Sequence, residues 1–207
     1  MRENRMEVVC SVCPHYCRLM EGQRGRCGVR RNEKGEIVCD NYGKITALAL
    51  DPIEKKPLRQ FLPGSLILSV GSFGCNLSCP FCQNHEISMP DAAGAACREI
   101  TPEELAELAA DCCSRGDGYE RKNIGVAYTY NEPLVGYEFV RNTAELVREK
   151  GMKNVLVTNG TAEISVLEEL LPYIDAMNID LKGFSEAYYR LRDTAGRYLK
   201  NVYTGNC

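Results

Sequence analysis

The sequence has no polybasic tract and no apolar run long enough to be a signal peptide or a membrane span. Its net charge is only -3 and its pI is near 5.6, so electrostatics favours neither nucleic acid nor a membrane surface as the main partner. Tryptophan, low-complexity tracts and internal repeats are absent as well. We therefore expect a cytoplasmic protein with no membrane and no nucleic acid among its partners.

Cysteine, in contrast, is abundant. The chain has 207 residues, of which 12 are cysteine, 44% are hydrophobic and 26% are charged. This composition suits one globular domain with at most a small appendage. Because cytosolic thiols are kept reduced, this number of cysteines favours metal ligands over disulfides and indicates more than one metal site.

The first cysteine group is Cys10-x2-Cys13-x3-Cys17-x9-Cys27. The segment is rich in glycine and turns and has no apolar pattern long enough to fold unaided, so a bound metal would supply the missing stability. Four cysteines can hold zinc or a second iron–sulfur cluster, and His15 could replace one of them. The alternative is a loop with incidental thiols.

The second group is Cys75-x3-Cys79-x2-Cys82, in a glycine-rich loop that follows an apolar strand. Three thiolates are one fewer than a protein-held cubane cluster or a structural zinc ion needs. On a four-iron cluster they leave one iron open to bind something else. Buried cysteines, or a disulfide with a spare thiol, are the alternative, but such tight spacing in a loop favours a metal.

Apolar, β-rich runs predict strands over residues 66–70, 123–130, 154–157 and 176–181. Between them, Thr101 with Glu104 forms a capping pair that opens a helix. Three further helices are expected. One covers residues 134–150, one begins at a second capping pair made by Ser165 and Glu168, and one covers residues 185–192. A short strand over residues 45–50 lies in what we interpret as a connector. This alternation predicts parallel βα units.

Polar clusters follow each of these strands. After the cysteine loop they are 129–133, 158–160 and 180–183. Singly, each is an ordinary turn or surface pair. Because ligands gather at the carboxyl ends of parallel strands, their recurrence predicts one shared binding site.

The cysteine loop, with Phe81 just before its third cysteine, resembles the signature of the radical S-adenosylmethionine (SAM) superfamily. Other stretches resemble members associated with the AmmeMemoRadiSam system, relatives of pyruvate formate-lyase activating enzyme. They are Cys13-Pro14-His15, 50–58, 63–65, 74–84, 128–133 and 178–183. The resemblance covers roughly residues 10 to 192.

The resemblance implies that Cys75, Cys79 and Cys82 ligate a [4Fe-4S] cluster whose open iron is chelated by the amino and carboxylate groups of SAM. Phe81 would lie near the adenine, and Asn131 with Glu132 replaces the Gly-Gly-Glu-Pro stretch that receives the amino group in many relatives. Further cofactor contacts are expected from Thr158, Asn159, Asp180 and Lys182. In the activating enzymes a monovalent cation lies beside the SAM carboxylate, and Thr158 and Asp180 match the pattern of its ligands. Val157 stands where an acidic ligand is expected, so the resemblance does not firmly predict the cation.

The implied reaction is reductive cleavage of SAM to a 5'-deoxyadenosyl radical that abstracts hydrogen from a substrate, a small molecule or a protein. The electron donor would be a reductase or a flavodoxin- or ferredoxin-type protein. No catalytic side chain is assigned. The alternative is a non-catalytic iron–sulfur or zinc protein that carries electrons or binds a partner, and kinship alone suggests a glycyl-radical activase.

The resemblance also implies a partial (β/α) barrel. Relatives have six strands, whereas this chain accounts for four or five parallel ones, so we expect a shortened barrel that binds SAM less well or has lost activity. We expect residues 1–62 to form the cysteine-rich module and connector and residues 63–207 the shortened core. The open parallel edge needs a cover, for which self-association is one candidate.

Overall fold

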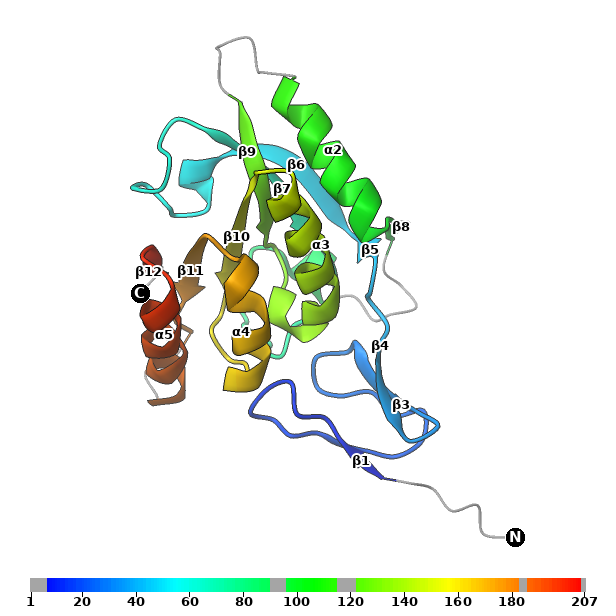
Figure 1. Cartoon of the computed structure of the whole chain (residues 1–207). Coiled ribbons are helices and arrows are strands. Elements are labelled where there is room, and N and C mark those ends of the chain that lie inside the picture. The colour runs from blue at the N-terminus through cyan, green and yellow to red at the C-terminus, as the bar shows by residue number, and fades with distance from the viewer. Residues whose placement is uncertain (1–6, 90–95, 115–121, 183–185, 206–207) are drawn as a thin grey trace, which may run out of the picture.

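Five parallel strands form the centre of the structure (Figure 1). The computed structural model describes residues 7–89, 96–114, 122–182 and 186–205. In the main sheet the strand order is β12-β11-β10-β9-β7-β6, and only β6 runs antiparallel to its neighbour. The strands are β6 (Ala47–Pro52), β7 (Leu66–Gly71), β9 (Asn123–Tyr128), β10 (Lys153–Thr158), β11 (Ala176–Asp180) and β12 (Val202–Gly205). The prediction of an α/β fold with four or five parallel strands is confirmed.

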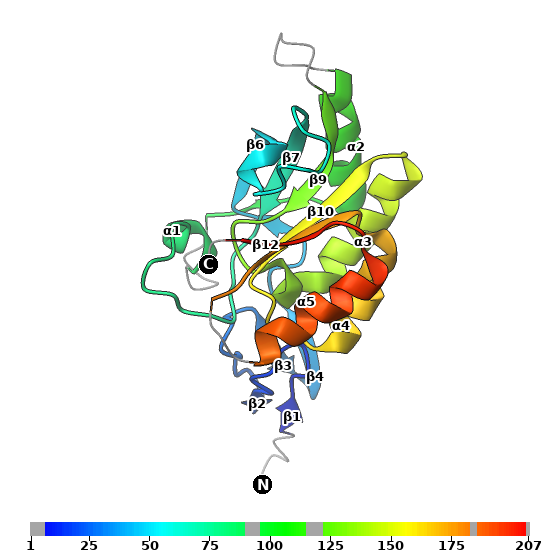
Figure 2. The ribbon, with the colours of Figure 1, turned by 90° about the vertical axis from the view of Figure 1, so that its left-hand side faces the viewer.

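Four helices lie on one face of this sheet, as Figure 2 shows. They are α2 (Pro102–Ser114), α3 (Tyr137–Glu149), α4 (Ile164–Leu170) and α5 (Glu186–Tyr198). The capping pair of α2 is confirmed, since the Thr101 backbone N–H donates to Glu104 (2.8 Å) and the Glu104 backbone N–H donates to the Thr101 hydroxyl (3.2 Å).

Three helix predictions need correction. The predicted capping pair of α4 is wrong: Glu163, in extended conformation, is the N-cap, and Ser165 and Glu168 lie inside the helix. The last helix, α5, continues past residue 192 to Tyr198. Before α3, a short 3-10 turn, η2 (Pro133–Gly136), occupies the start of the predicted 134–150 helix.

The inner face of the sheet is covered by the chain between β6 and β7. Side chains alternate between the faces of a strand, so Leu68 and Leu156 pack under the helices while Ile67 and Val155 point inward. The inward residues contact Ile53, Leu58 and Phe61 from the segment that the sequence marks only as a connector, including the 3-10 turn η1 (Ile53–Lys55). This segment therefore forms part of the core.

The amino-terminal module consists of short antiparallel pairs: β1 (Val8–Val9) with β2 (Arg18–Leu19), and β3 (Arg30–Glu33) with β4 (Glu36–Cys39). A third pair, β5 (Lys44–Ile45) with β8 (Arg98–Glu99), joins the module's end to the chain before α2. Because β6 pairs with β7 along its whole length, the main sheet already begins at residue 47. The division at residue 62 stays a proposal.

Within the described ranges, no helix has both the length and the apolar character that crossing a membrane requires.

Candidate functional site

A cavity of about 410 Å³ lies at the carboxyl ends of the parallel strands. It is lined by the three loop cysteines and by every side chain that the sequence marks as a cofactor contact: Phe81, Asn131, Glu132, Thr158, Asn159, Asp180 and Lys182. Val157 and Tyr130 also line it, whereas Cys10, Cys13, Cys17 and Cys27 do not. The strand ends are thus brought together as the sequence pattern implies.

The cysteine loop leaves β7 through Gly74, whose φ is +96°. A Cβ there would lie 2.5 Å from Cγ1 of Val29, so only glycine fits. The Sγ atom of Cys75 accepts the backbone N–H of Leu77 (3.4 Å) and the side-chain amide of Asn159 (3.8 Å). Burial, with a smaller contribution from the nearby charge of Glu132, raises the pKa of the Cys75 thiol to about 12.

The other two cysteines face the same cavity. Cys82 lies 3.7 Å from the Ser88 hydroxyl at the end of the short helix α1 (His85–Ser88). In the part of the chain that the structure describes, no three His, Cys, Asp or Glu side chains converge as ligands of one metal ion. In a cubane cluster each thiolate binds a different iron, so such convergence is not required. Three thiols around a polar cavity fit a four-iron cluster with one open iron.

Glu132 is the most constrained side chain of the site. Its carboxylate, 2% exposed, accepts hydrogen bonds from the Thr158 hydroxyl (2.6 Å) and from the backbone N–H groups of Asn159 (2.7 Å) and Leu134 (3.0 Å). Burial raises its pKa to about 7, although these three donors lower it. A buried carboxylate beside an open cavity is suited to receive the N–H groups of a cationic or metal-bound amine.

Asn131 uses its amide within the protein. Its Nδ2 donates to the carbonyls of Phe73 (3.3 Å) and Gly74 (3.1 Å), and its Oδ1 accepts the backbone N–H of Ser72 (3.0 Å). It therefore fastens the loop after β9 to the cysteine loop. The expected role of Asn131 as a direct partner of the amino group stays a prediction.

Asp180 and Lys182, after β11, form an ion pair of 3.2 Å on the far wall of the cavity. The Lys182 Nζ lies 6.0 Å from the ring centroid of Phe81, which is 69% exposed. An exposed aromatic ring beside a cation offers a stacking surface for a planar ligand.

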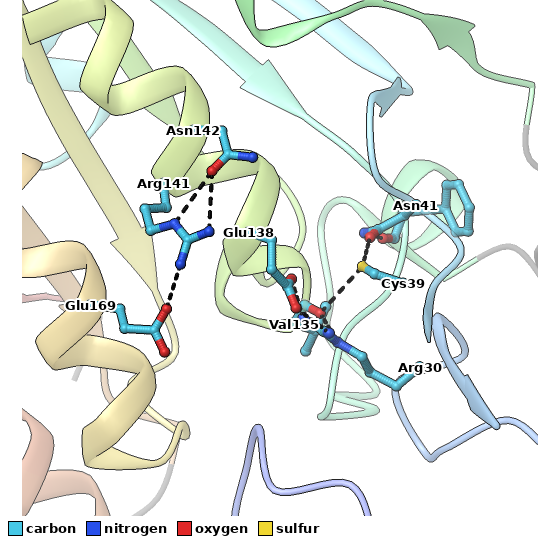
Figure 3. A network of polar contacts seen from close by, with 9 residues as sticks. Arg30, Cys39, Asn41, Val135, Glu138, Arg141, Asn142 and Glu169 are labelled. Carbon is cyan, nitrogen blue, oxygen red and sulfur yellow. Dashed lines mark hydrogen bonds and ion pairs between the residues drawn. The ribbon is translucent and has the colours of Figure 1, made fainter. Parts of the chain in front are cut away.

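The amino-terminal module holds loops next to the site, and Figure 3 shows the contacts of Arg30 with Val135 and Glu138. The buried Arg30 donates from Nε to the Val135 carbonyl (2.6 Å) and forms a bidentate pair with Glu138 (both 2.6 Å). Asn41 donates to the Phe73 carbonyl (2.7 Å). Arg30 thus holds the loop after Glu132, and Asn41 holds the loop before Cys75.

The amino-terminal cysteines lie in the same module. Cys10 and Cys17 face each other across the first hairpin, where the Cys10 backbone N–H donates to the Cys17 carbonyl (3.0 Å). The Cys27 carbonyl accepts the backbone N–H of Cys75 (3.2 Å), so this module touches the cysteine loop. His15, the alternative ligand, donates instead to the Asn76 carbonyl (2.8 Å).

Two contributors to the site escaped the sequence analysis. Tyr130 lines the cavity with φ +72°, a conformation that no sequence signal marks in a tyrosine. Asn76 is buried and joins two loops, since it accepts the Asn159 amide (2.9 Å) and donates to the Thr161 carbonyl (2.5 Å). Its place inside the cysteine loop was the available signal.

The model of the Radical SAM superfamily matches residues 69–204 of the chain. An uncharacterized protein of Methanocaldococcus jannaschii is 43% identical over 186 residues, which are 89% of this chain and 52% of that protein. The pyruvate formate-lyase-activating enzyme of Clostridium pasteurianum is 28% identical over 118 residues, 56% of this chain and 46% of that enzyme.

The cysteine-type anaerobic sulfatase-maturating enzyme of Clostridium perfringens is 33% identical over 106 residues, 48% of this chain and 27% of that enzyme. The chain thus spans about half the length, or less, of these relatives. The range matched by the family model includes the cysteine loop and every other residue that lines the cavity. On this match, over most of its length, the chain belongs to the radical SAM superfamily.

Proposed function

We propose that the protein cleaves SAM reductively at the cavity described above and directs the resulting radical to a substrate. Membership of the superfamily implies a [4Fe-4S] cluster and SAM. When bound, these groups supply the electron transfer and the 5'-deoxyadenosyl radical that abstracts hydrogen. The observation that carries the proposal is that three thiols and a buried carboxylate, from separate strand ends, face one cavity.

Each wall of the cavity has a role in this proposal. Cys75, Cys79 and Cys82 hold the cluster, and Glu132 accepts the amino group of SAM. Phe81 stacks on the adenine. The contact between the Lys182 ammonium and the Phe81 ring orients these two side chains beside each other. In addition, Thr158 and Asn159 hold Glu132 in place, and Asp180 closes the cavity from the end of β11.

The activity is tested by anaerobic reconstitution with iron and sulfide, followed by dithionite and SAM. We expect release of 5'-deoxyadenosine, measured by chromatography, and a loss of at least about 100-fold in Cys79→Ser, because one cluster ligand is gone. The matched control is Cys97→Ser, which changes an exposed cysteine outside the site. An intact wild-type cluster that releases no deoxyadenosine would favour the non-catalytic alternative.

The protonation of Glu132 gives a second test. With a pKa of about 7, its carboxyl is mostly protonated at pH 6 and mostly ionised at pH 8. Only the ionised form is a full acceptor for the amino group, so SAM affinity, measured by calorimetry, should rise roughly tenfold over this range.

The control is Glu132→Gln, which we expect to bind SAM more weakly because an amide cannot ionise. Titration of SAM itself affects both proteins equally, so the ratio of their dissociation constants isolates Glu132. A ratio that stays constant from pH 6 to pH 8 would contradict this role.

The substrate and the electron donor are proposed only by class. A reductase or a flavodoxin- or ferredoxin-type protein would supply the electron, and the substrate is a small molecule or a protein. One relative is named as an activating enzyme for pyruvate formate-lyase. Activation of a glycyl-radical enzyme is therefore a second candidate, and self-association across the β12 edge remains the proposed cover for the sheet.

We also propose a metal in the amino-terminal module, although among the described residues no three His, Cys, Asp or Glu side chains already converge as ligands of one metal ion. Cys10, Cys13 and Cys27 are buried, and the Cys17 sulfur accepts the backbone N–H of Arg26 (3.4 Å), a hydrogen bond that stabilises a thiolate. The module consists of two-to-four-residue strands with little core of its own, so a metal would add stability.

Elemental analysis of the Cys75/Cys79/Cys82→Ala variant tests this second site. We expect about one zinc per chain, or iron with the absorbance of a cluster, and its loss when Cys13→Ser is added. A triple variant that contains neither zinc nor iron would show that these cysteines are incidental thiols and not metal ligands.

A further inference from the structure

A cluster of polar side chains around Asp51, here called the Asp51 group, lies next to the cavity. Asp51, at the end of β6, accepts hydrogen bonds from the Lys56 ammonium (2.9 Å), the Lys55 ammonium (3.1 Å) and the Tyr130 hydroxyl (2.7 Å). Asp51 and Lys56 are 7% and 3% exposed, whereas the Lys55 side chain is 66% exposed. The Lys56 Nζ also lies 4.7 Å from the centroid of the Tyr130 ring.

This group is anchored on several elements of the inner face. Asp51 belongs to β6, Lys56 follows η1, and the Lys56 carbonyl accepts the side-chain amide of Asn178 on β11 (3.3 Å). Burial raises the pKa of the Asp51 carboxyl, but the three donors outweigh it and bring the pKa well below its ordinary value. The carboxylate therefore stays ionised beside Lys56.

A buried ion pair adds little net stability over a packed apolar core, so stability alone does not account for this group. It is connected to the cavity through Tyr130, which both contacts Asp51 and lines the cavity. Neither Asp51 nor Lys56 lines the cavity itself.

Tyr130 has an unusual backbone. Its φ is +72°, in the left-handed region that costs free energy for an aromatic residue. The turn also lies directly on Gly71, where an added Cβ would come within 2.8 Å of the Tyr130 Cβ. Such a conformation persists only where surrounding contacts enforce it, and the hydroxyl and ring contacts with Asp51 and Lys56 are among these contacts. The Asn131 backbone N–H also donates to the Thr129 carbonyl across the turn (3.0 Å).

The two residues after Tyr130 connect this turn to the neighbouring loops of the site. Asn131 fastens this turn to the carbonyls of Phe73 and Gly74, and Glu132 receives its three hydrogen bonds from the far side. A change of the Tyr130 backbone toward an ordinary conformation would turn the following peptide and move both side chains.

We propose that Asp51 and Lys56 are positioning residues of the SAM site: by holding Tyr130 in its left-handed conformation, they place Asn131 and Glu132 against the cavity. This inference rests on the proposed function. It assigns no contact between either residue and SAM.

Three variants of the reconstituted protein test the proposal: Tyr130→Phe, Asp51→Asn and the two together. Tyr130→Phe removes a single hydroxyl and keeps the ring over Lys56. We expect each single variant to raise the dissociation constant for SAM about tenfold at unchanged iron content. Because the Tyr130 hydroxyl acts through the ionised Asp51 carboxylate, the double variant should bind no more weakly than the worse single one.

The matched control is Tyr173→Phe, whose hydroxyl bonds Glu145 (3.4 Å) on the exposed surface away from the cavity. It should bind SAM like the wild type. Lys55→Met should also have a small effect, since its exposed ammonium adds one of three bonds to Asp51.

The outcomes separate this proposal from the proposed function. Wild-type affinity in Tyr130→Phe and Asp51→Asn, while the wild type itself binds SAM, overturns the positioning role and leaves the function standing. Loss of iron in parallel with loss of SAM binding, or additive effects in the double variant, indicates a general structural role and also overturns it. A wild type that holds its cluster but does not bind SAM removes the proposed function and this inference together.

Discussion

The site depends on the buried carboxylate of Glu132, which joins two neighbouring strand ends. It follows β9, and its acceptor oxygens bind the hydroxyl of Thr158 and the backbone of Asn159 at the end of β10. An unsatisfied carboxylate at this depth would cost several kcal/mol, so the two loops must keep this geometry. Burial also leaves the group ready to ionise near pH 7. The three hydrogen bonds that Glu132 accepts, from Thr158, Asn159 and Leu134, thus fix both the positions of these loops and the place of the carboxylate in the site.

Other parts of the chain hold this arrangement from three directions. Arg30 and Asn41 of the amino-terminal module bind the loops around Val135 and Phe73 from behind. Asn131 fastens the β9 loop to the cysteine loop, and the Asp51 group lies on the inner face of the sheet. These hydrogen bonds hold the loops of the site in one arrangement without a bound cofactor, as positioning of reactive groups requires. The segments outside the parallel strands serve the site as much as the strands do.

The sequence predicted the parts of the structure that depend on local pattern. Apolar runs bounded by turns located β7 and β10, and the spacing from Cys75 to Cys82 located the cysteine loop. Because parallel strands share one carboxyl edge, the polar strand ends were also expected to meet. Long-range pairing has no such local signal, so the place of β6 in the main sheet could not be predicted. Nor could the left-handed Tyr130, since aromatic residues rarely adopt that conformation.

We propose that SAM binds at the open iron left by Cys75, Cys79 and Cys82. Electron–nuclear double resonance of the reduced cluster, with SAM carrying nitrogen-15 in its amino group, measures this contact directly. We expect a resolved nitrogen-15 coupling in the wild type and a weaker coupling in Glu132→Gln at the same SAM concentration. A loaded, reduced cluster that binds SAM without any nitrogen coupling would contradict it.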